Sequence, residues 1–120
     1  MAQSVQPADI IVNGHVSIHF KAAFHKTYEL NLENNSCHRI AYRVENSNPS
    51  AVAIEPQFGI LALTEKVTIN IACLDFSNGG SNDNIEVAWT NTPSHGRFNQ
   101  EWFQGNGMIR RTVLKVAYHE

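Results

Sequence analysis

The sequence predicts an all-β fold in which two sheets pack face to face as a sandwich. Three observations support this: apolar and polar residues alternate along seven short runs, turn-forming residues separate the runs, and no window of about 12 residues keeps helical spacing. Short strands joined by such turns favour an immunoglobulin-like topology, with a closed barrel as the alternative. With 120 residues, of which 42% are hydrophobic and 17% charged, the chain is predicted to form a single domain, residues 1–120, around one core.

Each predicted strand has one apolar face, because successive side chains of a strand point to opposite sides. The seven runs, in chain order, span residues 16–20, 28–32, 40–44, 52–54, 67–73, 85–89 and 114–118. Two shorter apolar stretches, 10–12 and 60–63, are candidates for extra strands. Turns between the runs are predicted from the Asn, Ser, Pro and Gly clusters at 34–36, 46–49, 56–59 and 77–83. The prediction is therefore a seven-stranded sandwich.

The net charge, the apolar runs, the opening residues and the cysteine content indicate which partners and which compartment to expect. A formal net charge of -2 disfavours nucleic acid as a partner, because proteins that bind polyanions carry a marked basic excess. The chain has no run of about 18 apolar residues that would insert into a membrane. Its opening residues lack the basic and apolar regions of a signal peptide, so synthesis in the cytosol is expected. In that compartment Cys37 and Cys73 are expected to be free thiols.

The sequence shows no pattern of catalytic residues and predicts neither an enzyme nor a bound cofactor. It has no Gly-x-Ser-x-Gly elbow, and Gly105-Asn106-Gly107 lacks the Lys-Ser/Thr of a phosphate-binding loop. His15 and His19 are four residues apart, which on a strand separates them by about 13 Å, so they cannot share one metal ion. No catalytic, cofactor-binding or metal-ligating residue is therefore expected.

The strand that contains His15, Val16, Ser17, Ile18 and His19 is a candidate for self-association. Its polar residues alternate with the apolar ones and face away from the core. At a sheet edge such a strand leaves main-chain donors and acceptors open to a second chain, since no lysine protects this face. A two-fold axis would pair the strand with its own copy, and protonation of the histidines would weaken that pair as the pH falls. The same residues also fit a strand face that is simply solvated.

Segments 83–93 and 101–111 resemble the major sperm protein family of nematodes. They read Asp-Asn-Ile-Glu-Val-Ala-Trp-Thr-Asn-Thr-Pro and Glu-Trp-Phe-Gln-Gly-Asn-Gly-Met-Ile-Arg-Arg. The family carries very similar Trp-Thr-Asn-Thr-Pro and Glu-Trp-Phe-Gln-Gly-x-Gly-Met-x-Arg-Arg motifs. The opening residues and Gly59-Ile60-Leu61 are also similar to the family, so the resemblance spans nearly the whole chain.

The resemblance implies an immunoglobulin-like seven-stranded sandwich and a structural, non-enzymatic role in crawling nematode sperm. Members of that family form symmetric dimers that assemble into filaments without bound nucleotide, and released protein signals to the oocyte and gonadal sheath. The implied partners are a second copy of the chain, other sperm cytoskeletal proteins, or a receptor on the oocyte or sheath. The implied location is the cytoplasm and pseudopod of sperm, with release that needs no signal peptide.

Departures from the family pattern favour a second interpretation, in which the chain regulates filaments or binds proteins or peptides without polymerising. The same domain in the VAMP-associated membrane proteins binds acidic FFAT peptides through a basic face. At the positions of that face the resemblance places Glu45, Asn46, Ser47, Asn84 and Glu86. Glu45 stands where those proteins have a lysine, so the charge of the face is reversed. Acidic peptides are therefore predicted to bind weakly.

Overall fold

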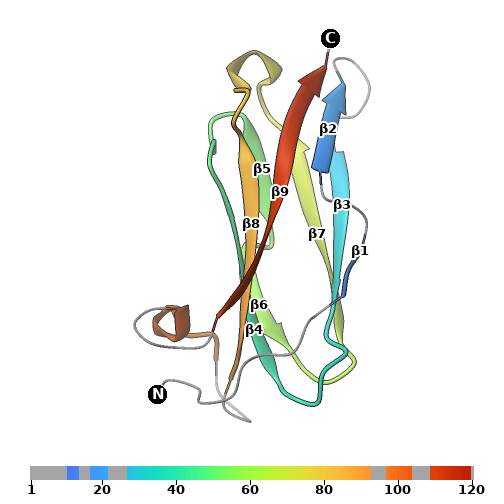
Figure 1. Ribbon diagram of the computed structural model, residues 1–120, viewed down its shortest axis with the longest axis vertical. Helices are drawn as coiled ribbons and strands as arrows, with labels where there is room; N and C mark the ends of the chain where they lie inside the picture. The colour runs from blue at the N-terminus through green and yellow to red at the C-terminus, as the bar shows by residue number, and fades with distance from the viewer. Residues whose placement is uncertain (1–10, 14–16, 22–26, 93–96, 104–108, 120) are drawn as a thin grey trace.

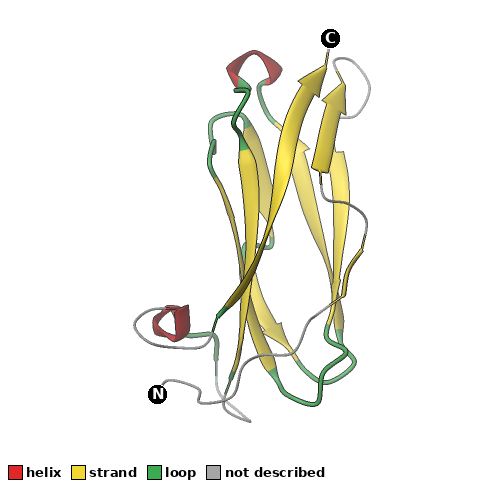
Figure 2. Ribbon diagram, in the orientation of Figure 1, coloured by secondary structure: helices red, strands yellow, loops and turns green. Residues whose placement is uncertain are grey.

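The computed structural model describes residues 11–13, 17–21, 27–92, 97–103 and 109–119, and these form two packed β-sheets (Figure 1). One sheet has the spatial order β1 (Ile11–Asn13), β3 (Thr27–Glu33), β7 (Lys66–Cys73) and β5 (Val52–Glu55). The other has the order β2 (Ser17–Lys21), β9 (Arg110–His119), β8 (Asn84–Asn91), β4 (Ile40–Asn46) and β6 (Phe58–Leu61). Two single-turn 3₁₀ helices, η1 (Phe76–Asn78) and η2 (Gln100–Phe103), lie in the connections (Figure 2). The predicted all-β sandwich is confirmed.

The described residues contain nine strands rather than seven. The two additional strands, β1 and β6, overlap the short apolar stretches at 10–12 and 60–63. They have three and four residues, so an alternating pattern hardly develops in either. All paired strands are antiparallel except β2 and β9, which run parallel. Of the strand predicted at 16–20, residue 16 lies outside the described residues.

The main core fills the space between the two sheets. Its side chains are the apolar ones that the alternation in the sequence assigns to the inner faces, and all are at most 4% exposed. The larger members are Ile18, Phe20, Leu30, Leu32, Ile40, Tyr42, Ile54, Leu61, Ile69, Ile71, Ile85, Val87, Trp89, Leu114 and Val116. Burial of this apolar surface supplies most of the favourable free energy of folding.

A second, smaller apolar cluster covers one end of the outer face of the five-stranded sheet. Ala41 of β4 and Ala88 of β8 lie there beneath Phe103 of η2. Phe98 packs against Phe103 with ring centres 5.8 Å apart and extends the cover. Strict alternation predicts that both alanines are exposed to solvent, but η2 covers them. Their small side chains leave room for the aromatic rings.

Asn34 is completely buried and joins two connections at one end of the sandwich. Its Nδ2 donates to the carbonyl oxygens of His38, Leu61 and Ala62 at 2.8, 3.0 and 3.2 Å. Its own carbonyl accepts from the N–H of Thr64 at 3.0 Å, where the chain has a φ of 66° that is uncommon outside glycine. The β3–β4 and β6–β7 connections each lead from one sheet to the other, and the hydrogen bonds of Asn34 join the two connections.

Replacing Asn34 by alanine should lower the free energy of unfolding by about 2–4 kcal/mol, because one buried and two partly buried carbonyl groups would lose their donor. Urea unfolding followed by tryptophan fluorescence measures the change. Asn70→Ala is the matched control, since Asn70 is exposed on β7, and it should change stability by no more than about 0.5 kcal/mol. Equal losses in the two variants would contradict the role assigned to Asn34.

Candidate functional site

Strand β2 forms one edge of the five-stranded sheet, next to β9 (Figure 1). Ile18 and Phe20 point into the core and are completely buried, whereas His19 and Lys21 are exposed. The four edge strands β1, β2, β5 and β6 have three to five residues, and the inner strands have seven to ten. Short edges limit unspecific pairing. As the longest of the four, β2 offers the most main chain to a partner.

The residues predicted for self-association are only partly described. Ser17, Ile18 and His19 lie in β2, while His15 and Val16 fall outside the described residues. The sheet order therefore supports the assumption that this strand lies at an edge. Lys21, at the end of the same strand, is an exposed lysine that the prediction did not consider.

His19 pairs with His119 across β2 and β9. Nδ1 of His19 lies 2.8 Å from Nε2 of His119, and the ring centres are 5.0 Å apart. The distance between centres exceeds the N···N distance by about two ring radii, so the rings meet edge to edge through one N–H···N hydrogen bond. One ring donates and the other accepts. Spacing along the chain could not reveal this partner, because 100 positions separate the two histidines.

The residues predicted for a peptide-binding face lie together where β4 ends and β8 begins. Glu45 and Glu86 are directly opposite each other in the β4–β8 ladder. Just beyond them, the N–H of Ser47 donates to the carbonyl of Asn84 at 3.0 Å, and the N–H of Asn84 donates to the Ser47 hydroxyl at 2.9 Å. Oδ1 of Asn46 accepts a main-chain N–H of the following connection at 2.9 Å. Asn84, Glu86 and Glu45 thus share the outer face of the sheet with Ser47 beside them, whereas Asn46 pairs with the buried Ile85 and belongs to the other face.

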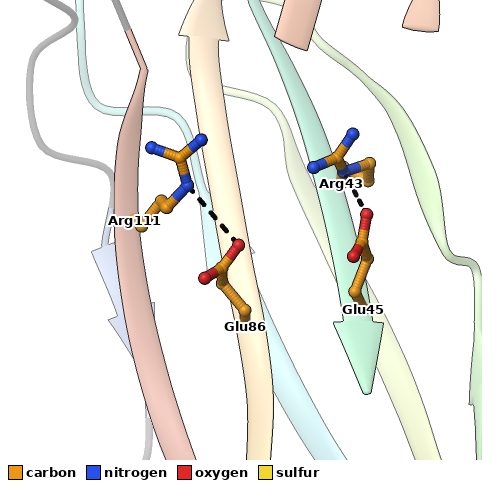
Figure 3. A network of polar contacts seen from close by, with 4 residues as sticks. All are labelled: Arg43, Glu45, Glu86 and Arg111. Atoms are coloured by element: carbon orange, nitrogen blue, oxygen red, sulfur yellow. Dashed lines mark ion pairs between the residues drawn. The ribbon is translucent and has the colours of Figure 1, made fainter. Parts of the chain in front are cut away.

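Each of the two glutamates on this surface contacts an arginine (Figure 3). Nε of Arg43 lies 2.7 Å from Oε1 of Glu45, and Nε of Arg111 lies 3.5 Å from Oε1 of Glu86. The closer contact brings opposite charges together without hydrogen-bond geometry, and the Arg43 guanidinium also lies 4.9 Å from the ring centre of Phe103. The prediction of a reversed charge did not consider these two arginines. Two arginines balance two glutamates, so the network is neutral.

Asp83 is the centre of a polar cluster just before β8. Its Oδ2 accepts from the hydroxyl of Tyr118 at 2.7 Å, from Nδ2 of Asn48 at 2.9 Å and from the N–H of Gly80 at 3.0 Å. Gly79 packs so closely against the Tyr118 ring that a Cβ there would lie 2.6 Å from it. Asn48 belongs to the β4–β5 connection and Gly80 to the β7–β8 connection. One carboxylate therefore holds these two connections and the end of β9 together.

Opposing effects act on the pKa of Asp83. Burial raises it, but the hydrogen bonds from Gly80, Tyr118 and Asn48 outweigh burial and hold the pKa below its ordinary value. Burial raises the pKa of Tyr118, and the hydrogen bond to Asp83 and the charge of that carboxylate raise it further. At neutral pH a neutral phenol therefore donates to a charged carboxylate, which is the stronger kind of hydrogen bond.

Metal-ligating and thiol side chains are dispersed in the part of the chain that the structure describes. That part holds no group of three or more His, Cys, Asp or Glu side chains that could bind a metal ion. Cys37 is exposed and Cys73 partly buried, and both are free thiols, as predicted. The helices found among these residues are single turns, and none reaches the length and apolar character needed to cross a bilayer.

The sequence matches a family model and several known proteins. The model, described as the MSP (Major sperm protein) domain, matches residues 9–107. The chain is 38% identical to Major sperm protein 10/36/56/76 and 37% identical to Major sperm protein 78, both of Caenorhabditis elegans. Each alignment extends over 126 positions and covers 99% of this chain and 99% of the relative.

Solved structures show the same fold. WR4, a C. elegans MSP family member, superposes with a TM-score of 0.72 at 20% identity, over 91% of this chain and 96% of that one. The YadV chaperone superposes with a TM-score of 0.62 at 13% identity, over 94% of this chain and 53% of that one. At these low identities the similarity establishes the immunoglobulin-like sandwich and nothing about activity.

The Asp83–Tyr118 pair should stabilise the fold between about pH 4 and pH 10. Unfolded aspartate and tyrosine titrate near 3.9 and 10. Because the folded pKa of Asp83 is lowered, its contribution is present above about pH 4 and is lost as the pH falls through the folded pKa. Because the folded pKa of Tyr118 is raised, its contribution is present below about pH 10 and is lost as the pH rises through the folded pKa.

Tyr118→Phe tests this window, and should lower the free energy of unfolding by about 1–3 kcal/mol at pH 7. The deficit relative to wild type should shrink at both pH extremes when it is measured by urea unfolding. Asp83→Asn is the companion variant, and the difference between wild type and Asp83→Asn should likewise shrink below about pH 4. A Tyr118→Phe deficit of equal size at pH 3, 7 and 11 would refute the assignment.

Proposed function

The chain belongs to the major sperm protein family, and from this premise we propose that it is a structural protein of nematode sperm that self-associates. Proteins of this family are structural and non-enzymatic, so the chain is not an enzyme. The observation that carries the proposal is the extent of the similarity, 38% identity over 99% of both chains. Strands and connections alike are included, and these are the parts through which such a domain meets a partner.

A symmetric dimer is the basic unit of the proposed assembly, and the open side of β2 is its contact. Two-fold symmetry pairs a strand with its own copy in antiparallel order. In a pair centred on residue 19, His19 faces His19 of the second copy, and the register position of Lys21 faces that of Ser17. The resulting sheet would be continuous through both subunits. The five residues of β2 limit the number of main-chain hydrogen bonds, so a moderate affinity is expected.

Filament growth needs a second contact, because a two-fold contact uses one surface twice and closes. Strand β6 is the opposite edge of the same sheet, and its Phe58 is 56% exposed. We assign the second contact to this edge. Filaments of such dimers would support amoeboid movement in the sperm pseudopod, and released protein would signal to the oocyte or sheath.

Replacing His19 by lysine should weaken self-association about tenfold or more, because two ammonium groups would then face each other across the axis. Sedimentation velocity over a range of protein concentrations at pH 7.5 measures this. His38→Lys is the matched control, since it adds the same charge at an exposed position in the β3–β4 connection and should leave association unchanged.

A second variant separates the edge from the histidine pair. His119→Gln removes the partner of His19 without adding charge to β2, and it should associate like wild type. A wild-type chain that stays monomeric at high concentration would defeat the proposed self-association. A His19→Lys variant that associates as well as wild type would defeat only the choice of edge.

The alternative function, a peptide-binding module, is supported by the surface around Glu45 and Glu86. Its Arg43 and Arg111 are cationic groups that an acidic peptide could use, but both are already in contact with glutamates. An acidic FFAT peptide must therefore compete with the chain's own carboxylates, and weak binding is expected.

The double variant Glu45→Lys with Glu86→Met should bind an acidic FFAT peptide at least tenfold more tightly than wild type. Two arginines and a lysine would replace a neutral network, so the peptide would meet unbalanced positive charge. Isothermal titration calorimetry measures the affinity. Glu29→Lys with Glu55→Met changes the net charge equally on exposed positions of the other sheet and should have little effect. Micromolar binding by wild type would contradict the prediction.

A further inference from the structure

Strand β9 continues past the start of β8 (Figure 1). A cleft lies beside this last part of β9. Asn84, the first residue of β8, pairs with Lys115, and the N–H of Val116 donates to the carbonyl of Asp83 at 2.9 Å. Beyond this point the connection that contains Gly79, Gly80 and Ser81 lies along β9 in place of a strand. The space between them measures about 570 Å³, which is within the range of small-ligand sites.

The lining of this cleft is mixed, because Lys115, His19 and Ser81 bring polar groups and Val116, Ala117 and the Tyr118 ring bring apolar surface. Lys115 and His19 contribute from the two strands, Ser81 contributes a hydroxyl, and Ala117 and the two glycines leave the space open. No carboxylate is among the lining residues. Within the described residues, the ammonium group of Lys115 makes no ion pair or hydrogen bond. The charge of Lys115 is therefore not balanced by a carboxylate there.

Among the described residues, the carboxylate of Asp83 lies close to Gly80 of the cleft lining. Oδ2 of Asp83 accepts three hydrogen bonds, from Tyr118, Asn48 and Gly80. Asp83 is not among the lining residues and makes no ion pair with Lys115, so its carboxylate does not neutralise the lysine directly.

The His19–His119 pair can add charge to one wall of the cleft. The two rings share one hydrogen bond, and a single additional proton preserves that bond in its stronger, charge-assisted form. A proton taken up by the pair therefore places a cation beside Lys115 without breaking the contact between β2 and β9. An additional proton on the pair would thus make the cleft more attractive to anions.

We propose that this cleft binds a tetrahedral oxyanion, the phosphate or sulfate group of a small ligand, with Lys115 and Ser81 as its donors and the histidine pair as an auxiliary charge. Lysine binds phosphate as a point charge, and a group with several terminal oxygens can meet donors on both walls at once. The cleft and the proposed self-association edge share His19, but Lys115 and Ser81 lie outside β2. Lys115→Gln therefore tests the cleft without altering the edge.

Titration of sulfate against the amide resonances of the ¹⁵N-labelled protein tests the proposal. At pH 7 and constant ionic strength, saturable shifts should appear for residues 79–83 and 115–119. Lys115→Gln should bind at least tenfold more weakly. Lys66→Gln, which removes an exposed lysine from the other sheet, should bind like wild type. Absence of saturable shifts in wild type, or equal affinity in Lys115→Gln, would overturn the proposal.

The pH dependence tests the part assigned to the histidines. Sulfate keeps both charges between pH 5.5 and 7.5, so a change in its affinity reports on the protein. Among the described residues, the other charged or titratable groups close to the pair are Lys21, Lys115, Asp83 and Tyr118. Sulfate should bind several-fold more tightly at pH 5.5 than at 7.5, and His19→Gln should abolish that difference. If His19→Gln kept the same difference in sulfate affinity between pH 5.5 and 7.5, the histidine pair would have no part in the site.

A parallel titration identifies the source of the oxyanion. O-phosphoserine serves as a small phosphate monoester, and inorganic phosphate serves as the free ion. An ester that binds at least tenfold more tightly than the free ion, with loss of binding in Lys115→Gln, would assign the cleft to esterified ligands. Equal affinities would assign it to the free ion.

Discussion

The fold depends on how the chain satisfies its polar groups where it passes from one sheet to the other. A backbone that leaves a sheet loses its ladder partners, and a buried N–H or C=O without a partner costs free energy. Two side chains meet this need, and the connections that they join lie at opposite ends of the sandwich (Figure 1). Asn34 fastens the β3–β4 connection to the β6–β7 connection, and Asp83 fastens the β4–β5 connection to the β7–β8 connection. The apolar core then fills the space between two sheets whose connections are held together by these hydrogen bonds.

The position of Asp83 also decides where the surface is open. Because its carboxylate is held by Gly80, Asn48 and Tyr118, the chain enters β8 only at Asn84, after the connection has passed along the end of β9. Val116 to His119 are left without β8 as a neighbour, although β2 still pairs with them on the other side. The cleft beside Lys115 is thus a consequence of the same carboxylate that ties the connections together.

Alternation predicted the inner faces because it reports directly on which side of a strand meets the core, as Ile85, Val87 and Trp89 illustrate. It could not predict burial that comes from elsewhere in the chain, such as Phe103 over Ala41 and Ala88. Asn34 reads as a turn residue in the sequence, and its donation to Leu61, 27 positions away, leaves no local signal. The contact of Arg43 with Glu45 could have been anticipated, since residues two apart share a strand face.

The outer face of the five-stranded sheet changes character along its length. At one end aromatic side chains of η2 cover it, in the middle arginines balance glutamates, and at the other end Lys115 and His19 line a cleft that has no carboxylate in its lining. The net charge of -2 conceals this distribution, because it averages over both sheets. His19 contributes to both the proposed edge and the proposed cleft. A proton on its ring would favour an oxyanion in the cleft and disfavour a second copy whose own His19 lies across the axis. Protonation of His19 therefore couples the two proposed surfaces, because it would strengthen oxyanion binding in the cleft and weaken self-association at the edge.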